Sequence, residues 1–208
     1  MPSNVDRRQH WDDAYSTRGT EGVSWFQPEP TVSLELIRSL GVERSAAVVD
    51  VGGGASFLVD RLFEMGYRDV SVLDVSEVAL AAGQQRLGGS TNVSWLHEDV
   101  LAWRPARQYG LWHDRAVFHF LTSQDEQSAY LESMESAITP GGSLVLATFA
   151  NDGPEHCSGL PVTRYSAEEL VDRLGPHFSL AMSRRELHTT PGGATQPFTW
   201  VAGTIGSG

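Results

Sequence analysis

One stretch of the chain, Asp50-Val51-Gly52-Gly53-Gly54-Ala55-Ser56, combines residue types that suit the binding of a polar ligand. The apolar residues Val48 and Val49 precede it, as in a buried strand, and the mixed apolar run 57–63 follows it. This pattern predicts a strand, a tight turn and a helix. Glycine permits the turn and lets a ligand approach the backbone, and the free N–H groups at the start of the helix point towards the same place.

The turn does not match three other motifs built on glycine. The dinucleotide-binding motif requires a third glycine where Phe57 stands, after Gly52 and Gly54 supply the first two. A P-loop requires a lysine, which does not follow. A nucleophile elbow requires a glycine two residues after its serine, whereas Ser56 is followed by Phe57 and Leu58. A nicotinamide-dependent dehydrogenase is therefore a weak alternative, and no Tyr-x-x-x-Lys run supports it.

A second acid, Asp74, ends the apolar run Val70-Ser71-Val72-Leu73, which predicts the next strand. It lies roughly twenty residues beyond the glycine turn, where a carboxylate at a strand end can hold ribose hydroxyls. The turn and this acid together predict a site for a ligand that contains ribose.

Three further motifs follow in order: Leu73-Asp74-Val75-Ser76, Glu98-Asp99-Val100 and Thr139-Pro140-Gly141-Gly142. With the glycine turn, they resemble the motifs of the class I S-adenosylmethionine-dependent methyltransferases, and the resemblance runs over nearly the whole chain. Each motif is weak alone, but four in this order and spacing are fairly specific. Ser56 stands where many members carry a third glycine, which is a common variation.

The resemblance implies that S-adenosylmethionine is the cofactor. Asp74 should then hold the ribose and Asp99 should face the adenine amino group, with Phe118 or Val100 as a wall of the adenine site. Gly52 and Gly54 should pass under the methionine part. The cofactor-binding residues that we expect are Asp50, Gly52, Gly54, Ser56, Asp74, Val75, Asp99, Val100, Phe118 and, from the leader, Trp11, Tyr15 and Trp25.

The leader, residues 1–30, is polar but carries four large rings: Trp11, Tyr15, Trp25 and Phe26. Such rings either staple a leader to the core or form a flap. Related methyltransferases have a Trp-Asp-x-x-Tyr leader that folds over the cofactor and substrate, so we expect residues 1–30 to form an aromatic lid. Gly19 and Gly22 are candidate hinges, and the lid should order when cofactor binds. Residues 31–208 should form the cofactor-binding part of a single domain.

Strand-like and helix-like segments alternate along the rest of the chain, which predicts a mostly parallel, doubly wound sheet. The expected strands are 46–51, 70–74, 93–97, 109–114, 143–149, 178–187 and 198–205, and the expected helices are 31–40, 56–65, 77–87, 124–138 and 167–174. Residues 151–164 read as a loop. We therefore predict an α/β fold with a Rossmann-like, seven-stranded sheet and helices on both faces; by resemblance, the last strand is antiparallel to the rest.

Methyl transfer from a sulfonium mainly requires that the acceptor is positioned and that water is excluded. A general base is needed only when the acceptor arrives protonated. His119 is our candidate base, Asp114 the candidate orienting carboxylate and His113 a further catalytic candidate, because all three lie just after the fourth strand. The alternative is that these histidines only pack or form hydrogen bonds. Cys157 is not expected to act as a nucleophile, and the histidines show no spacing for a metal site.

Composition narrows the possible partners. The chain has 208 residues and a formal net charge of −11, so its surface should repel nucleic acid. No apolar run is long enough to span a bilayer, and the N-terminus lacks the apolar core of a signal peptide, so we expect a cytoplasmic protein without membrane partners. A single cysteine leaves no pair for an internal disulfide. The oligomeric state stays open.

Three functions remain after this reasoning. The leading hypothesis is a methyltransferase that acts on O, N or S of a small molecule. The alternative is a protein lysine methyltransferase, because the leader also resembles that of such enzymes and the negative charge would suit a basic protein. A weaker alternative is a nucleotide-binding protein without activity. The sequence does not name the acceptor.

Overall fold

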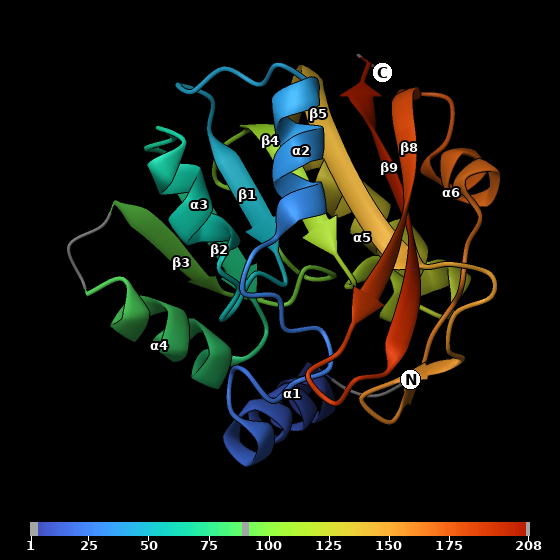
Figure 1. The fold of residues 1–208 in the computed structure, drawn as a ribbon. Helices are drawn as coiled ribbons and strands as arrows, with labels where there is room; N and C mark the ends of the chain where they lie inside the picture. The colour runs from blue at the N-terminus through green and yellow to red at the C-terminus, as the bar shows by residue number, and fades with distance from the viewer. Residues whose placement is uncertain (1–3, 89–91, 207–208) are drawn as a thin grey trace.

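A computed structural model of the chain, which describes residues 4–88 and 92–206, contains a twisted seven-stranded sheet in the order β3-β2-β1-β4-β5-β9-β8 (Figure 1). The strands are β1 (Val48–Val51), β2 (Val70–Asp74), β3 (Val93–His97), β4 (Tyr109–Arg115), β5 (Ile138–Phe149), β8 (Phe178–Thr189) and β9 (Thr195–Ile205). β9 runs antiparallel to both of its neighbours, β5 and β8, and the other neighbouring strands of this sheet are parallel. The predicted fold class is therefore confirmed, including the antiparallel last strand.

Helices cover both faces of the sheet. On one face, α2 (Thr31–Ser39), α3 (Leu58–Glu64) and α4 (Glu77–Arg86) pack over a core built on the central strands. On the other, α5 (Gln124–Ala137) and α6 (Ala167–Leu174) pack over a second core. Every residue of β1 and β2 is buried, as expected for parallel strands with both faces covered. A further helix, α1 (Asn4–Arg18), lies across the carboxyl ends of the strands (Figure 1).

Several helices begin or end at residues with capping chemistry. Ser76 caps α4 by accepting a hydrogen bond from the Ala79 N–H, and Ser166 forms the predicted capping box with Glu169 at the start of α6. Gly41 follows α2 with φ of +67°, in the left-handed region that glycine adopts without strain. Gly88 follows α4 in the same way; Gly89, which was also expected to end this helix, lies outside the described residues.

Several boundaries differ from the predicted ones. β5 begins at Ile138 rather than 143, because the residues from Pro140 to Gly142 continue the strand through an irregular ladder to β4 instead of ending it. The expected loop 151–164 contains a small hairpin of β6 (His156–Cys157) and β7 (Leu160–Pro161). α3 begins at Leu58, not Ser56, because the Ser56 N–H bonds Gly53 O in the preceding turn.

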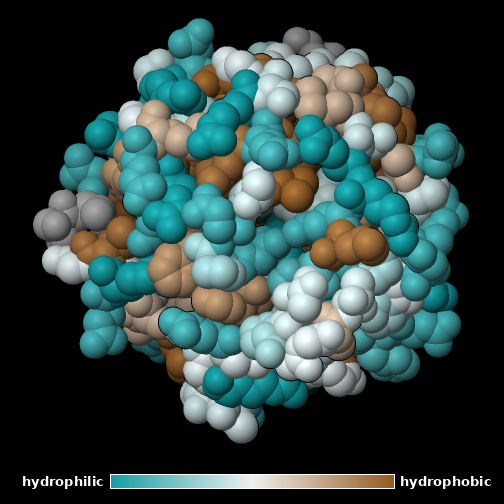
Figure 2. Space-filling model, in the orientation of Figure 1, coloured by the Kyte–Doolittle hydropathy of each residue, from teal (hydrophilic) through white to brown (hydrophobic). Residues whose placement is uncertain are grey.

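The surface in Figure 2 is mostly hydrophilic, with scattered apolar residues. Among the described residues, the exposed large apolar side chains are Val78, Leu180 and Leu187, which do not form a large apolar patch. None of the described helices is both long and apolar enough to cross a membrane.

Candidate functional site

A cavity opens at the carboxyl edge of the sheet, beneath α1, and we call it the main cavity. It holds about 900 Å³ of space, part of it open to solvent. At its acidic end, beside β2 and β3, lie Asp74 and Asp99. At its other end, which we call the far end, lie the last residue of β4 and residues of later elements: Arg115, Phe120, Phe149, Cys157, Gln196 and Phe198.

A smaller side cavity lies against the glycine turn and includes Ser33, Asp50, Gly53, Ser56 and His113 in its lining. The two cavities share five lining residues: Tyr15, Trp25, Val51, Gly52 and Arg115. One extended ligand can therefore pass from the acidic end, over Gly52, into the side cavity.

Gly52 stands between the cavities in a conformation that only glycine adopts easily. Its φ is +67°, and its N–H donates to Leu73 O at 2.7 Å. A β-carbon at this position would come within 2.1 Å of Val117 Cγ2. Gly54 is similarly constrained, because a β-carbon there would lie 2.7 Å from Asp74 Oδ2. The turn thus depends on glycine for close packing as well as for ligand approach.

The Asp74 carboxyl is buried at the end of β2, where Oδ1 accepts a hydrogen bond of 2.8 Å from the Ser76 N–H. Burial raises the pKa of Asp74 to about 7, and the negative charge of Asp50 adds to the shift. Backbone N–H groups of Ser76 and Val75 stabilise the ionised form only in part, and a ligand that donates further hydrogen bonds would stabilise it more.

Asp50 is held by His113, whose Nδ1 lies 2.7 Å from Asp50 Oδ1. The other ring nitrogen of His113 lies 2.9 Å from Ser33 Oγ, so both nitrogens are engaged. The remaining oxygen, Asp50 Oδ2, is buried and has no hydrogen-bond partner in the structure. A buried carboxylate oxygen without a donor is unfavourable, which marks this atom as an acceptor for a ligand group.

Asp99 is paired with the leader. Oδ2 accepts from Arg7 Nε at 3.2 Å and Nη2 at 2.9 Å, and Oδ1 accepts from the Leu101 N–H. The same arginine donates to Glu126 on α5. Arg7 therefore closes α1 over the acidic end of the main cavity and compensates the charge of Asp99.

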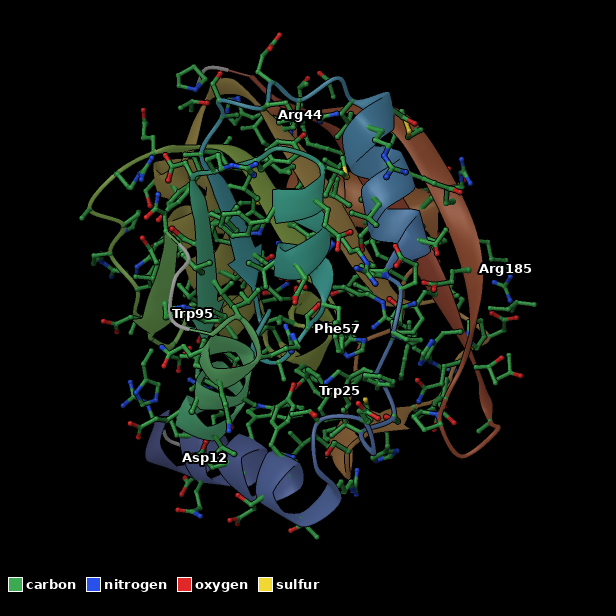
Figure 3. The ribbon with its side chains drawn as sticks, turned by 60° about the vertical axis from the view of Figure 1, so that its left-hand side comes forward. Asp12, Trp25, Arg44, Phe57, Trp95 and Arg185 are labelled. Atoms are coloured by element: carbon green, nitrogen blue, oxygen red, sulfur yellow. The ribbon has the colours of Figure 1, made fainter. Side chains whose placement is uncertain are left out.

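α1 is also bound to the start of α4. Asp12 Oδ1 accepts from Ser76 Oγ at 2.6 Å and from the Val78 N–H at 3.2 Å, at the place where α1 meets α4 (Figure 3). A carboxylate there is favoured by the helix dipole. Trp11 packs edge-on against Phe120 and Trp25, which roofs the main cavity with aromatic rings.

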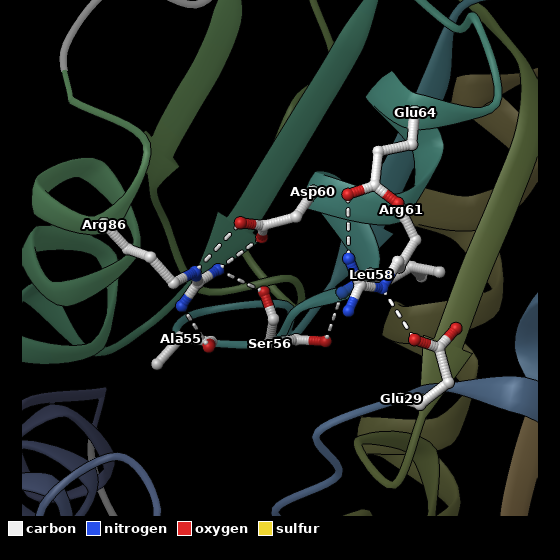
Figure 4. Close-up of polar contacts among 8 residues, drawn as sticks. All are labelled: Glu29, Ala55, Ser56, Leu58, Asp60, Arg61, Glu64 and Arg86. Atoms are coloured by element: carbon white, nitrogen blue, oxygen red, sulfur yellow. Dashed lines mark hydrogen bonds and ion pairs between the residues drawn. The ribbon is translucent and has the colours of Figure 1, made fainter.

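The glycine turn is held from outside by Arg86 at the end of α4 (Figure 4). Its guanidinium donates to the carbonyls of Ala55 and Ser56 at 2.8 and 2.7 Å and forms a two-bond pair with Asp60. It also lies 4.2 Å from the ring centre of Phe57. These contacts fix the far side of the turn and leave its inner side to the cavities.

Comparison with known proteins places this geometry in a family. Residues 48–142 match a family model described as a methyltransferase domain. Over 112 residues, the chain is 24% identical to malonyl-[acyl-carrier protein] O-methyltransferase 1 of Ilyobacter polytropus, with 53% of this chain and 41% of that protein covered. Over 206 residues it is 23% identical to EEF1A lysine methyltransferase 2 of Danio rerio, with coverages of 90% and 80%.

The fold is similar to that of a 1,6-didemethyltoxoflavin-N1-methyltransferase from Burkholderia thailandensis, solved with 1,6-didemethyltoxoflavin and S-adenosylhomocysteine bound. The TM-score is 0.69 at 20% identity, covering 98% of this chain and 85% of the other. These matches support a place for the chain in the class I S-adenosylmethionine-dependent methyltransferase family. It spans about half the length of the first curated relatives that it matches, 41% and 52% of two malonyl-[acyl-carrier protein] O-methyltransferases.

In this chain, most residues expected to bind cofactor lie together. Those that line the main cavity are Trp11, Tyr15, Trp25, Gly52, Asp74, Val75, Asp99 and Val100, while Asp50 and Ser56 line the side cavity. Gly54 and Phe118 line neither. The short helix η1 (Phe118–Phe120) turns the Phe118 ring into the core against Tyr130, at 4.9 Å, and leaves Val117 on the cavity wall.

The three catalytic candidates are placed differently from the expectation. Asp114 is buried and accepts from the Val117 and Phe118 N–H groups and from Tyr130 Oη, so it caps η1 and lines neither cavity. His113 orients Asp50. His119 Nδ1 accepts from the Phe149 N–H, burial lowers its pKa to about 3, and it lines neither cavity. The lone pair on His119 Nδ1 is thus engaged by the Phe149 N–H and is not available to accept a proton from a substrate.

Sequence reasoning missed four residues of the site, Arg7, Asp12, Arg86 and Arg115. All four bind partners at least 26 residues away in the chain. The local signals available were the place of Asp12 in the Trp-Asp-x-x-Tyr leader and the place of Arg115 directly after a strand-ending acid. Groups of three or more potential metal ligands are absent from the part of the chain that the structure describes.

The lid prediction can be tested through Asp12. We expect Asp12→Ala to speed tryptic cleavage at the exposed Arg18 several-fold, because α1 loses its bonds to Ser76 and Val78. S-adenosylhomocysteine should slow this cleavage in the unaltered protein. Asp13→Ala is the matched control, since Asp13 is exposed and accepts only from Gln9 on its own helix. Equal cleavage rates for both variants, with and without ligand, would mean that the leader is fixed packing and not a lid.

Proposed function

We propose that this chain transfers a methyl group from S-adenosylmethionine to O, N or S of a small molecule. The main support for the proposal is that the Asp74 carboxylate is buried and lines the same cavity as Gly52. Ribose hydroxyls can donate to Asp74 in addition to its backbone donors, and the glycine leaves room for a ligand to continue past it.

The two other acids support the same ligand. The unpartnered Asp50 Oδ2 would accept from the amino group of the methionine part, and Asp99 would accept from the adenine amino group beside Arg7. Val100 would flank the adenine, and Gly52 would pass beneath the methionine part. These residues fit a ligand with an adenosyl group at one end and an amino acid at the other.

The cofactor supplies a methyl group that is already activated by the positive charge on sulfur. The chain's own contribution is to orient the acceptor and exclude water, which the rings of Trp11 and Trp25 over the main cavity would do. His119 has no free lone pair for a proton, so we do not assign it as a base. We propose instead that the acceptor reacts without one, as an anion or a neutral nucleophile.

The far end of the main cavity favours a small molecule over a lysine side chain. Its one charged side chain among the described lining residues is Arg115, and phenylalanine rings form much of the wall. A lysine ammonium would be repelled by that arginine and would find no carboxylate among these far-end residues. One observation supports the second candidate, a protein lysine methyltransferase: the match to EEF1A lysine methyltransferase 2 of Danio rerio extends over 80% of that protein.

The test is binding followed by transfer. We expect S-adenosylhomocysteine to bind in calorimetry with a micromolar Kd and to raise the melting temperature, while NAD does neither. The protein is then incubated with cell extract and methyl-labelled S-adenosylmethionine, and label is measured separately in metabolites and in protein. Label in metabolites supports the proposal, label in protein supports the lysine candidate, and binding without any transfer supports a non-catalytic nucleotide-binding protein.

A further inference from the structure

Arg115 is a nearly buried charge at the far end of the main cavity. Its side chain is 10% exposed, and its guanidinium lies 4.6 Å from the ring centre of Phe198 on β9. In the sheet, β9 lies beyond β4 and β5, on the side opposite to β1, β2 and β3. The charge therefore lies away from Asp74 and Asp99, and Arg115 lines the far end of the main cavity as well as the side cavity.

Two nitrogens of Arg115 have no hydrogen-bond acceptor. Nη1 donates to Trp25 O at 2.9 Å, whereas Nε and Nη2 are buried without a partner. These two nitrogens form one edge of the guanidinium, the edge that binds a carboxylate through two parallel hydrogen bonds. Buried donors without acceptors are unfavourable, so this edge is prepared for a partner that the protein does not provide.

The nearest carboxylate of the chain does not fill this role. Glu186 Oε2 lies 4.0 Å from Arg115 Nε, beyond hydrogen-bond distance, and it accepts from Trp200 Nε1 at 2.9 Å. Its other oxygen accepts from Gln27 Nε2 at 2.7 Å. Glu186 therefore balances the charge of Arg115 in part and leaves both donors free. Burial lowers the pKa of Arg115 to about 10, so the group stays charged at neutral pH.

The surroundings indicate the rest of the ligand. Phe120, Phe149 and Phe198 line the same end of the cavity and suit an apolar or aromatic body. Gln196 also lines it, and its Oε1 is buried without a partner. A ligand that places an oxyanion on Arg115 and a polar group near Gln196 would satisfy the unpaired groups at this end.

We propose that Arg115 forms an anion subsite that selects small-molecule methyl acceptors bearing a carboxylate on an apolar or aromatic body. The proposal rests on the proposed function, because it takes the far end of the main cavity to be the acceptor site. The carboxylate of the cofactor's methionine part is the other source of the same chemistry, and the test separates the two.

The probes are benzoate and benzamide, which differ only in the charged group. Their affinities are measured by calorimetry near pH 7.5, with the protein alone and with saturating S-adenosylhomocysteine. We expect benzoate to bind at least tenfold more tightly than benzamide. Arg115→Gln should reduce that preference to within threefold, and Arg115→Lys should keep part of it. The control, Arg184→Gln, removes the same charge from an exposed pair with Glu35 and should leave the preference unchanged.

The affinity for S-adenosylhomocysteine decides the source of the carboxylate. It should stay within threefold in Arg115→Gln; a tenfold loss with the benzoate preference intact would assign Arg115 to the methionine part and overturn the proposal. Equal affinities of the two probes, or no binding of benzoate, in the unaltered protein would also overturn it, whether or not the variants fold. If benzoate is preferred but S-adenosylhomocysteine does not bind, the result supports the anion subsite and contradicts the proposed methyltransferase function.

Discussion

Asp74→Asn is expected to raise the Kd for S-adenosylhomocysteine at least tenfold at pH 8. The ionised carboxylate can accept from two ribose hydroxyls, and hydrogen bonds to charged groups contribute about 1.5–3 kcal/mol each, where about 1.4 kcal/mol is a factor of ten in Kd. Calorimetry measures the loss. Glu77→Gln is the matched control, since Glu77 is an exposed carboxylate in the same segment that lines neither cavity. An unchanged Kd for Asp74→Asn would place the ribose elsewhere.

The same substitution should stabilise the ligand-free protein. The pKa of Asp74 is raised to about 7 in the folded chain, above the usual carboxyl range, so the folded state holds a proton that the unfolded state releases at lower pH. The free energy of unfolding therefore falls as the pH rises towards 7 and stays reduced above it. Asn does not ionise, so Asp74→Asn should melt higher than the unaltered protein at pH 8, with the difference shrinking towards pH 5. A lower melting temperature at pH 8 would mean that binding was lost through misfolding.

Gly52→Ala should weaken both folding and cofactor binding. A β-carbon there meets Val117 Cγ2 at 2.1 Å in a backbone with φ of +67°. Gly41→Ala is the matched control, because Gly41 has the same φ and nothing within 4 Å of its β-carbon position. Both variants bear the left-handed strain of about 1–2 kcal/mol, and Gly52→Ala adds about 1–3 kcal/mol of overpacking. At about 2–4 °C per kcal/mol, its melting temperature should fall roughly twice as far as that of the control.

Binding separates the two glycine variants further. Gly52→Ala should lose at least tenfold in affinity for S-adenosylhomocysteine, because Gly52 and Val117 both line the main cavity. Gly41→Ala should bind normally. Adding Val117→Ala to Gly52→Ala removes the clashing methyl groups and should restore part of the melting temperature. If Gly52→Ala has the same melting temperature and the same affinity for S-adenosylhomocysteine as Gly41→Ala, the close packing around the turn contributes neither to stability nor to binding.

Local patterns were sufficient wherever one segment determines its own structure. Val70–Asp74 and Val93–His97 have the predicted bounds, because each is a β-rich run between turn residues. Ser166 and Glu169 are three residues apart, so their capping box follows from spacing alone. The fold class follows in the same way from the order of such segments.

The parts that were not predicted depend on residues far apart in the chain. Arg7 binds Asp99 across 92 residues, and Arg115 binds Trp25 across 90. His119 was predicted as a base, but its Nδ1 accepts a hydrogen bond from the Phe149 N–H, 30 residues away. The types of these side chains were visible in the sequence, but their partners were fixed only by the order of the strands.

The attachment of α1 also bears on the order in which the chain assembles. Asp12 binds Ser76 across 64 residues, and Arg7 binds Asp99 and Glu126 across 92 and 119. When α1 is synthesised its docking partners are therefore still missing, because Ser76 follows Asp12 by 64 residues and Glu126 follows Arg7 by 119. Contacts of such long range close late because of their loop entropy. α1 is thus expected to settle after the strands on which it docks, and on unfolding it can detach while the sheet stays intact.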